Sequence, residues 1–243
     1  MSLRILALET STLDASVAVL EDARILGQVA FDRSRRTAQS FAPAIVHQLE
    51  SVGWRPQDLH LVAVSIGPGS FTGLRVGVTA AKTLAYAVGA DVLGIPTLQV
   101  VARQAPVRTA GISAVLDAQR QQLFVADFQH RDGQLVAGCD TRIVDAASWL
   151  EGLSPGTAVT GPGLVRWQDR IPAEVQVIEP SYWTPLAATV GQLAYEQYES
   201  GSRQDLWTLN PRYFRSSAAE ERWHSRSQDQ RLEMASALSP RLS

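Results

Sequence analysis

The chain has 243 residues, of which 45% are hydrophobic and 19% are charged, and its formal net charge is −2. This length is enough for one large domain or for two smaller lobes, each with a hydrophobic core of its own. The near-neutral charge excludes a general attraction to nucleic acid, so any such contact would be local or supplied by a partner.

The N-terminal apolar run, Leu3 to Leu8, is too short for the core of a signal peptide and leads into the polar residues Glu9-Thr10-Ser11-Thr12. No apolar run approaches the roughly 20 residues that a membrane-spanning helix needs. The single cysteine, Cys139, excludes an internal disulfide and suits a reducing compartment. We therefore expect a cytoplasmic protein without a membrane segment.

The first part of the chain predicts three strands, a helix, a strand, a second helix and a further strand. The first three strands are joined by short polar turns, which favours an antiparallel meander. Apolar residues at helical spacing, from Phe41 to Val52, indicate the first helix, and Gly53 ends it. Strands are expected over residues 3–8, 15–20, 25–31, 61–66 and 92–95, and helices over about 41–52 and 70–88.

The same order of elements then begins again. A strand ending in Asp117 corresponds to the strand ending in Glu9, and each half carries a Gly-Pro-Gly turn, at residues 67–69 and 161–163. Chance is one explanation, since α/β proteins share few building blocks, but the shared order favours an internal duplication. Strands are expected over residues 112–116, 123–128, 134–136 and 157–160, and helices near 146–150, after 163 and over 184–200.

A duplicated α/β unit is typical of the two-lobed actin-like ATPase (ASKHA, sugar-kinase-like) fold, although a fold alone does not assign an activity. We expect an N-terminal lobe over residues 1–103 that carries the partner-binding helices. A C-terminal lobe over 104–215 follows, with a last segment able to pack back on the first lobe. The polar tail, 216–243, is expected to be disordered or a loosely held helix.

Glu9 and the hydroxyl residues after it are a first candidate for phosphate binding. An acid at a strand end, followed by Thr10 and Ser11, is how actin-like ATPases hold a metal and a phosphate. The alternative is a hairpin turn in which the hydroxyl groups satisfy local backbone groups. The residue pattern leaves both interpretations open.

The turn Gly67-Pro68-Gly69-Ser70 is a second candidate, since it can bring backbone N–H groups and a helix N-terminus up to an anion. It is not a P-loop, because no Gly-Lys-Ser/Thr follows it, and it lacks the dinucleotide G-x-G-x-x-G spacing. The alternative is structural, with glycines that form the turn and Ser70 as the helix N-cap.

The helix that follows carries Gly73, Gly77, Ala81 and Ala85 at every fourth position, so these small residues share one stripe. Each interior glycine costs a helix about 1 kcal/mol relative to alanine, which indicates a compensating contact. The stripe packs either on the chain's own sheet or against a helix of a second chain, toward which Arg75 would then reach.

Metal, nucleophile and base-stacking chemistry find little support. His47, His60, His130 and His224 are never three or four residues apart, and no G-x-S-x-G nucleophile elbow is present. We therefore predict no catalytic residue and no metal ligand. The six tryptophans are scattered, and the one basic cluster, Arg33 to Arg36, is interpreted as a solvated loop that can at most touch a phosphate.

The segment from Ile66 to Lys82 resembles the signature of the TsaB (YeaZ) family, a bacterial tRNA threonylcarbamoyladenosine biosynthesis subunit. The stretch GPGSFTGLR is highly specific to this family and its relatives, and the resemblance extends to about Arg215. Supporting stretches are ILALETST at residues 5–12, LDAQRQQLF at 116–124, VTGPG at 159–163 and NPRYFR at 210–215.

The resemblance implies a non-catalytic partner of the related metalloprotein TsaD, with the ATPase TsaE joining them. Together they would move a threonylcarbamoyl group from its adenylate to an adenosine beside the anticodon of tRNAs reading codons that begin with A. It also implies a homodimer when the chain is alone, no intrinsic cofactor, and ATP or ADP bound, if at all, only in the complex. The alternative from another class is an actin-like small-molecule kinase with Glu9 and Asp117 as the acids that hold metal and ATP.

Residue roles follow from the resemblance by position. The predicted partner or dimer interface consists of Phe41, Ile45, Phe71, Thr72, Gly73, Arg75, Val76, Gly77, Ala81 and Ala85. The predicted nucleotide or phosphate contacts are Glu9, Thr10, Ser11, Gly67, Gly69 and Ser70. The sequence departs from the family pattern at Glu9, where aspartate is usual, at 37–39, where His-Ser-Glu is common, and at 119–122, where arginine and glutamate are usual.

Overall fold

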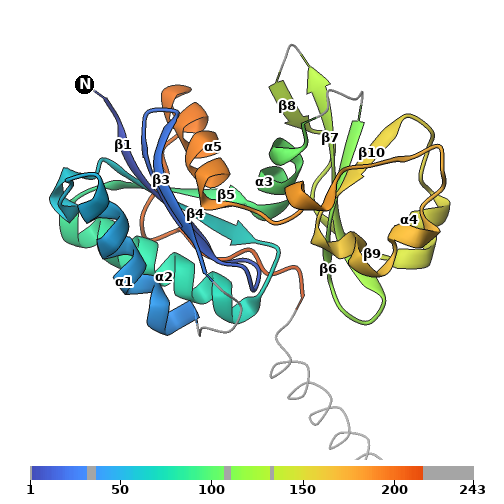
Figure 1. Ribbon diagram of the computed structural model, residues 1–243, viewed down its shortest axis with the longest axis horizontal. Coiled ribbons are helices and arrows are strands. Elements are labelled where there is room, and N and C mark those ends of the chain that lie inside the picture. Colours follow the sequence, from blue (N-terminus) through green and yellow to red (C-terminus); the bar gives the residue numbers. More distant parts are fainter. Residues whose placement is uncertain (1, 32–36, 107–110, 132–133, 216–243) are drawn as a thin grey trace, which may run out of the picture. The chain divides into compact units, whose positions relative to one another are not determined.

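The structure is a computed structural model that describes residues 2–31, 37–106, 111–131 and 134–215, with the side chains of 37–40 and 134 left out (Figure 1). Residues 1–212 form one compact unit, which ends before Tyr213. This unit holds two β-sheets with helices packed on them, so the predicted α/β class is confirmed.

The first sheet has the strand order β3-β2-β1-β4-β5. The pairs β1–β2 and β2–β3 are antiparallel, which confirms the predicted meander, and β1–β4 and β4–β5 are parallel. Its strands are β1 (Arg4–Glu9), β2 (Ser16–Glu21), β3 (Arg24–Ala30), β4 (Leu61–Gly67) and β5 (Asp91–Pro96).

Helices cover both faces of the first sheet (Figure 1). Helices α1 (Thr37–Ser51) and α2 (Phe71–Val88) pack on one face, where Leu6 and Leu8 of β1 belong to their core cluster. On the other face α5 (Ala187–Glu199) and α3 (Thr97–Gln104) share a cluster with Ile5 and Ala7. Because side chains alternate along a strand, these two sets bury β1 from both sides.

The second sheet has the order β11-β10-β6-β7-β8, with β9 paired to β7. Its central strand β6 is antiparallel to β7 and parallel to β10, as β1 is to β2 and β4. The two sheets therefore have the same strand order and directions, as an internal duplication requires. The elements are β6 (Gly111–Asp117), β7 (Gln122–Arg131), β8 (Gln134–Ala137), β9 (Arg142–Asp145), β10 (Thr157–Thr160), β11 (Gln176–Val177) and α4 (Ala146–Glu151).

The structure differs from the predicted elements in four places. Helix α3 and strands β9 and β11 had not been predicted. The helix expected after the second Gly-Pro-Gly turn is instead two short 3-10 helices, η2 (Pro162–Arg166) and η3 (Gln168–Arg170). Pro172 lies just beyond them and limits how far a helix can extend. Two further 3-10 turns are η1 (Pro56–Asp58) and η4 (Pro180–Tyr182).

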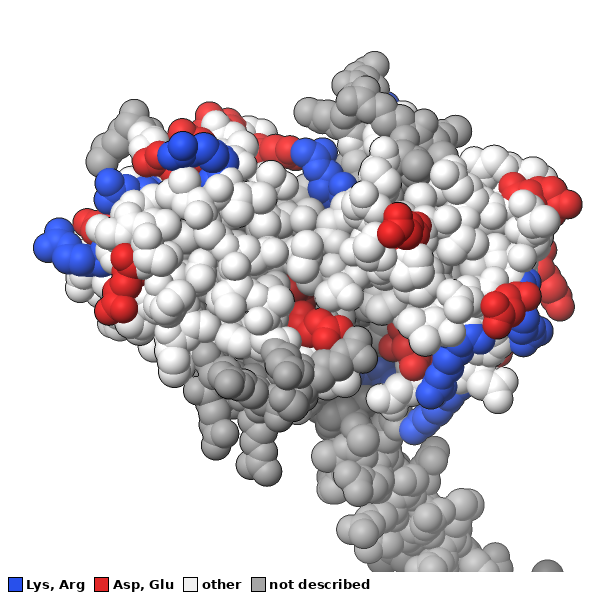
Figure 2. Space-filling model, viewed as in Figure 1, with Lys and Arg blue, Asp and Glu red and all other residues white. Residues whose placement is uncertain are grey.

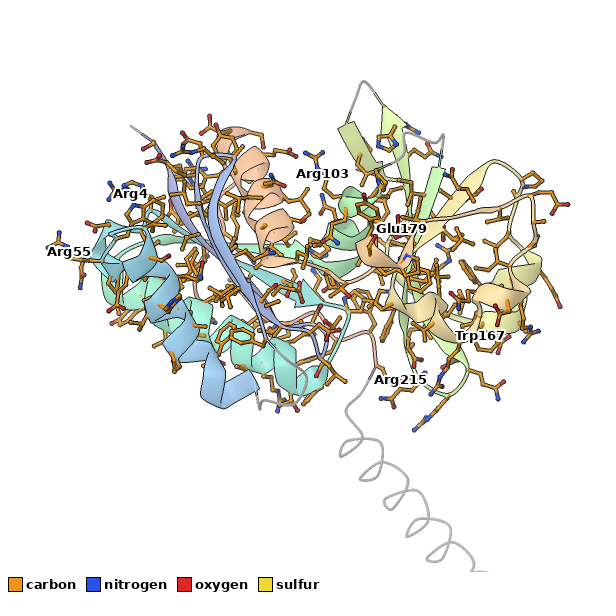
Figure 3. The ribbon with its side chains drawn as sticks, viewed as in Figure 1. Arg4, Arg55, Arg103, Trp167, Glu179 and Arg215 are labelled. Atoms are coloured by element: carbon orange, nitrogen blue, oxygen red, sulfur yellow. The ribbon has the colours of Figure 1, made fainter. Side chains whose placement is uncertain are left out.

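Helix α5 belongs to the later half of the sequence but packs on the first sheet. The backbone N–H of Ala187 donates to Ser16 Oγ at 2.9 Å, and that of Ala188 donates to Gln28 Oε1 at 2.8 Å. Arg103 at the end of α3 forms an ion pair with Glu196 of α5, and Figure 3 labels this arginine between the two helices. The predicted boundary at 103/104 stays a prediction, and residues 216–243 lie outside the described ranges.

Candidate functional site

The six predicted phosphate contacts lie together where β1 and β4 end and α2 begins. Thr10 N–H donates to the Ser65 hydroxyl of β4 at 3.3 Å, and Ser70 N–H donates to the Ser11 carbonyl oxygen at 2.6 Å. The first of these links is buried, and it joins the turn after β1 to the strand that precedes α2. The predicted grouping of these residues therefore exists in the fold.

The chain itself occupies the space in front of α2. The Ser11 carbonyl accepts from Ser70 N–H, and a Cβ on Gly69 would collide with the same oxygen. The Ser70 hydroxyl accepts from Gly73 N–H at 3.2 Å, so Ser70 is the N-cap of the helix. On the other side, Gly67 lies against the backbone of Arg212, whose N–H donates to the Ile66 carbonyl at 2.7 Å. The glycine turn thus contacts backbone of the same chain, as the structural interpretation requires.

Glu9 is fully buried beneath this turn. Its Oε1 accepts hydrogen bonds from the backbone N–H and the hydroxyl of Ser11, both at 2.5 Å, and none of the described residues donates to its Oε2. Burial raises the pKa of the Glu9 carboxyl above its ordinary 4.5, and the hydrogen bonds from Ser11 lower it by less. The carboxyl group therefore stabilises the turn after β1, in the manner of the hairpin interpretation.

The small residues of α2 pack within the chain. A Cβ added at Gly73 would collide with the Thr10 carbonyl oxygen, and one added at Gly77 would collide with the Thr10 hydroxyl. Ala81 and Ala85 belong to the core cluster under the first sheet. Packing on the chain's own sheet thus accounts for all four small residues. That these residues contact another chain stays a prediction. Their small size is no longer an argument for it, because contacts within the chain explain it.

The exposed side of α2 carries other residues of the predicted interface. Thr72 and Arg75 are exposed, and Phe71 and Val76 are half-buried. The Arg75 guanidinium lies over the Phe71 ring, 3.9 Å from its centroid, which gives this surface a fixed cation–π pair. On α1, Phe41 and Ile45 are buried and half-buried respectively. We define the outer face of α2 as Thr72, Arg75, Thr79, Thr83 and Tyr86, all exposed and spaced along one side of the helix.

An exposed aromatic pair lies at the end of this face and had not been predicted. Tyr86 and Trp207 are each 70% exposed and meet edge to face, with ring centroids 5.8 Å apart. Lys82 holds the segment around Trp207, because its Nζ donates to the carbonyl oxygens of Trp207 at 3.3 Å and Leu209 at 3.1 Å. The only sequence signal was an isolated tryptophan in a polar segment.

The second sheet has a corresponding strand end with a different environment. Asp117 at the end of β6 is exposed, and its Oδ1 accepts from Gln119 N–H at 2.7 Å. Gly161 and Gly163 of the second Gly-Pro-Gly turn approach the backbone of β6. Residues 119–121 all have positive φ, at 63°, 51° and 59°. This left-handed turn contains no glycine, so it could not be predicted from the residue types.

Within the part of the chain that the structure describes, no group of three or more His, Cys, Asp or Glu side chains could hold a metal ion; His224 lies outside it. Figure 2 shows Lys and Arg interspersed with Asp and Glu over the face in view. The basic cluster, residues 33–36, lies outside the described ranges. Among the described helices, none has both the length and the apolar character to cross a membrane.

Comparisons with known proteins agree on one family. The family model described as "TsaD: tRNA N6-adenosine threonylcarbamoyltransferase" matches residues 24–160. The chain is 31% identical over 147 residues to "tRNA threonylcarbamoyladenosine biosynthesis protein TsaB" of Bacillus subtilis, covering 60% of this chain and 64% of that protein. It is 25% identical over 224 residues to the Escherichia coli protein of the same name, covering 89% and 96% respectively.

A solved structure has the same fold. "YeaZ from Pseudomonas aeruginosa" superposes with a TM-score of 0.75 at 24% sequence identity, covering 87% of this chain and 99% of that one. At this identity the likeness concerns the fold, including its two-sheet architecture.

Proposed function

The chain belongs to the TsaB/YeaZ family, and we propose that it acts in tRNA threonylcarbamoyladenosine biosynthesis as a non-catalytic partner of a TsaD-type catalytic subunit. Its relatives in B. subtilis and E. coli carry that biosynthetic role in their names. The complex would transfer a threonylcarbamoyl group from its adenylate to the adenosine beside the anticodon of tRNAs reading codons that begin with A.

One observation carries the non-catalytic part of this proposal: the chain's own backbone fills the site that would bind phosphate. The Ser11 carbonyl accepts from the Ser70 N–H at the start of α2, and Glu9 is sealed below it. A phosphate at this helix N-terminus would have to displace a carbonyl oxygen that is already hydrogen-bonded. ATP or ADP would therefore bind, if at all, after a rearrangement in the complex.

The partner surface that we propose is the exposed start of α2 together with the neighbouring part of α1. The positively charged Arg75 guanidinium stacks on the Phe71 ring. Arginine and aromatic residues are both enriched at protein interfaces. Ile45 and Val76 are half-buried and add apolar area. The same surface would form the homodimer when the chain is alone, and a TsaE-type ATPase and tRNA would join through the complex.

Co-purification of the full chain with the TsaD-type subunit of the same cell tests this proposal. We expect Thr72→Arg, which adds a long charged side chain at an exposed position, to reduce recovery of the partner by about tenfold or more. The matched control is Ser202→Arg, an equally exposed site outside α1 and α2. Normal recovery with Thr72→Arg would overturn the surface, and no recovery with the unaltered chain would overturn the partner role.

The alternative of an actin-like small-molecule kinase is not favoured by the family of the relatives. It would need Glu9 to face a metal-bound nucleotide, whereas this carboxyl is fully buried and has a raised pKa. Phosphoryl transfer by the purified chain, lost on Glu9→Ala but kept on Asp140→Ala at an exposed site, would favour the kinase instead.

A further inference from the structure

A pocket of about 440 Å³ is lined by residues of the second sheet and of α4, none of which belongs to the proposed partner surface. Strands β6, β7 and β9 and helix α4 supply most of its walls. Its volume lies within the range of about 300–1,000 Å³ that is usual for small-molecule sites. Neither the resemblance nor the family comparisons assign it a role.

Ser113 is among the residues that line this pocket, and no described residue forms a hydrogen bond with its hydroxyl group. The residue is 3% exposed, so its side chain is shielded from water by the residues around it. In the sheet it lies opposite Asp127 of β7, another residue that lines the pocket. Buried polar groups are nearly always hydrogen-bonded, so an orphan hydroxyl at a pocket wall indicates a site where a ligand supplies the missing bond.

Opposite charges stand side by side at the same pocket. Arg142 of β9 and Asp127 of β7 form an ion pair, with Nη2 and Oδ2 2.8 Å apart, and their side chains are 44% and 41% exposed. Arg142 is held from a second side, because its Nη1 donates to the Cys139 sulfur at 2.9 Å. Both charged groups line the pocket, so a ligand meets a fixed guanidinium next to a fixed carboxylate.

The remaining walls are partly apolar. Trp149 and Leu153 come from α4 and the turn after it, and Val144 comes from β9. Trp149 is only 7% exposed and packs in the core cluster of the second sheet, which fixes the position of its ring. An apolar group of a ligand can therefore lie against a rigid surface beside the charged pair.

We propose that this pocket binds a free α-amino acid with an apolar side chain, in its zwitterionic form. The ligand carboxylate accepts from Arg142, its ammonium donates to Asp127, and the Ser113 hydroxyl bonds to the same polar end. The side chain packs against the apolar wall. A ligand with a single charge would place that charge next to a like charge of the ion pair, which is unfavourable in a partly buried site.

Three small molecules that share the leucine side chain but differ in charge test the proposed charge pattern, with the full-length protein as the receptor. L-Leucine carries both charges, N-acetyl-L-leucine lacks the ammonium and L-leucinamide lacks the carboxylate. Saturation-transfer NMR and calorimetry should detect L-leucine binding, with each analogue at least about tenfold weaker. Absence of L-leucine binding, or equal binding of either analogue, would overturn the proposal.

Two variants locate the binding. We expect Ser113→Ala and Arg142→Gln each to weaken L-leucine binding by about tenfold. The control Arg24→Gln alters an exposed ion pair with Glu21 in the first sheet and should leave binding unchanged. Ser113→Ala keeps a small side chain in β6 and so decides the matter if Arg142→Gln fails to fold. Binding that is unaffected by Ser113→Ala would place the ligand elsewhere and overturn the site.

Discussion

The ends of β1 and β6 occupy the same place in two sheets of the same topology, yet their acids lie in opposite environments. Glu9 is fully buried and bonds to Ser11, whereas Asp117 is exposed and bonds to Gln119. The covering element explains the difference, because the long helix α2 packs over the end of β1 while only the short η2 follows the corresponding turn near β6. The shared topology thus puts an acidic residue at the end of each central strand, but it does not determine whether that residue is buried or exposed.

Both glycine turns lie against backbone of the same chain, although through different positions of the turn. Gly69 lies against the Ser11 carbonyl, and Gly161 lies against the Val115 carbonyl, each too close to admit a Cβ. Both turns let the backbone beside the strand end approach the following segment closely. The glycines are therefore explained by contacts within the chain in both halves.

The largest expected effect is that of Gly77→Leu, which would break the contact between α2 and the turn after β1. The new side chain would start where the buried Thr10 hydroxyl lies, so we expect a loss of about 3 kcal/mol or more in the free energy of unfolding. Urea unfolding followed by circular dichroism measures it. The control Thr79→Leu, exposed on the same helix, should change stability by less than about 0.5 kcal/mol.

Equal stability of Gly77→Leu and the unaltered chain would show that packing within the chain does not explain this glycine, and the stripe would again be free to contact a partner. If stability falls as expected, loss of TsaD binding in such a variant would report unfolding and not an interface. The exposed Thr72 is for that reason the better position for testing the interface.

Helix α2 shows how far the sequence alone can lead. Its bounds could be predicted to within one residue, because Ser70 is a side-chain cap and Gly89 ends the helix in the left-handed conformation. Its partner could not be predicted, because Thr10 and Gly77 are far apart in the sequence and meet only through the register of β1 and β4. Local signals therefore suggested the candidate residues, and only the tertiary contacts showed that the chain itself fills the space between them.

The missed elements lack such local signals. Helix α3 begins directly after Pro96, a residue that also ends β5, and its eight residues are too few for a clear periodic pattern. Strand β9 has four residues, none fully buried, so it shows no alternation of buried and exposed positions. The pocket beside β9 could not be predicted either, since Ser113, Asp127 and Arg142 come from three strands whose pairing the sequence does not reveal.

Gly161→Ala tests the glycine turn of the second sheet, at residues 161–163. Its φ of +116° disfavours any residue with a Cβ, and that Cβ would also collide with the Val115 carbonyl, so we expect a loss of about 2 kcal/mol. The control Gly156→Ala has a φ of +81° but no atom within 4 Å of the new Cβ, and should lose only about 1 kcal/mol from backbone strain. Equal losses in urea unfolding would mean that the close approach to β6 contributes nothing.

The buried carboxyl of Glu9 predicts a pH dependence. Because burial raises its pKa in the folded state, the folded chain binds more protons than the unfolded chain between 4.5 and the raised value. The contribution of the Glu9 carboxyl to the free energy of unfolding is therefore largest below pH 4.5. It falls as the pH rises from 4.5 to the raised pKa of the folded state. Glu9→Gln mimics the protonated group, so we expect it to remove this fall and to make the chain more stable than the unaltered chain at pH 8.

Asp117→Asn serves as the matched control for this experiment, since it removes the exposed acid of the corresponding strand end. We expect urea unfolding at a series of pH values to show the same fall in Asp117→Asn as in the unaltered chain. A fall that persists in Glu9→Gln would show that another group causes the pH dependence and that the Glu9 carboxyl is not the distinguishing feature of the first sheet.

The smallest expected effect is that of Asp117→Ala. Its carboxylate accepts from Gln119 N–H at the start of the left-handed turn over residues 119–121, but the bond is exposed, so we expect a loss of about 0.5 kcal/mol. The control Asp140→Ala removes another exposed carboxylate and should cost less. An exposed hydrogen bond competes with water, so a loss of about 2 kcal/mol or more in urea unfolding of Asp117→Ala would show that burial is not what separates the two strand ends.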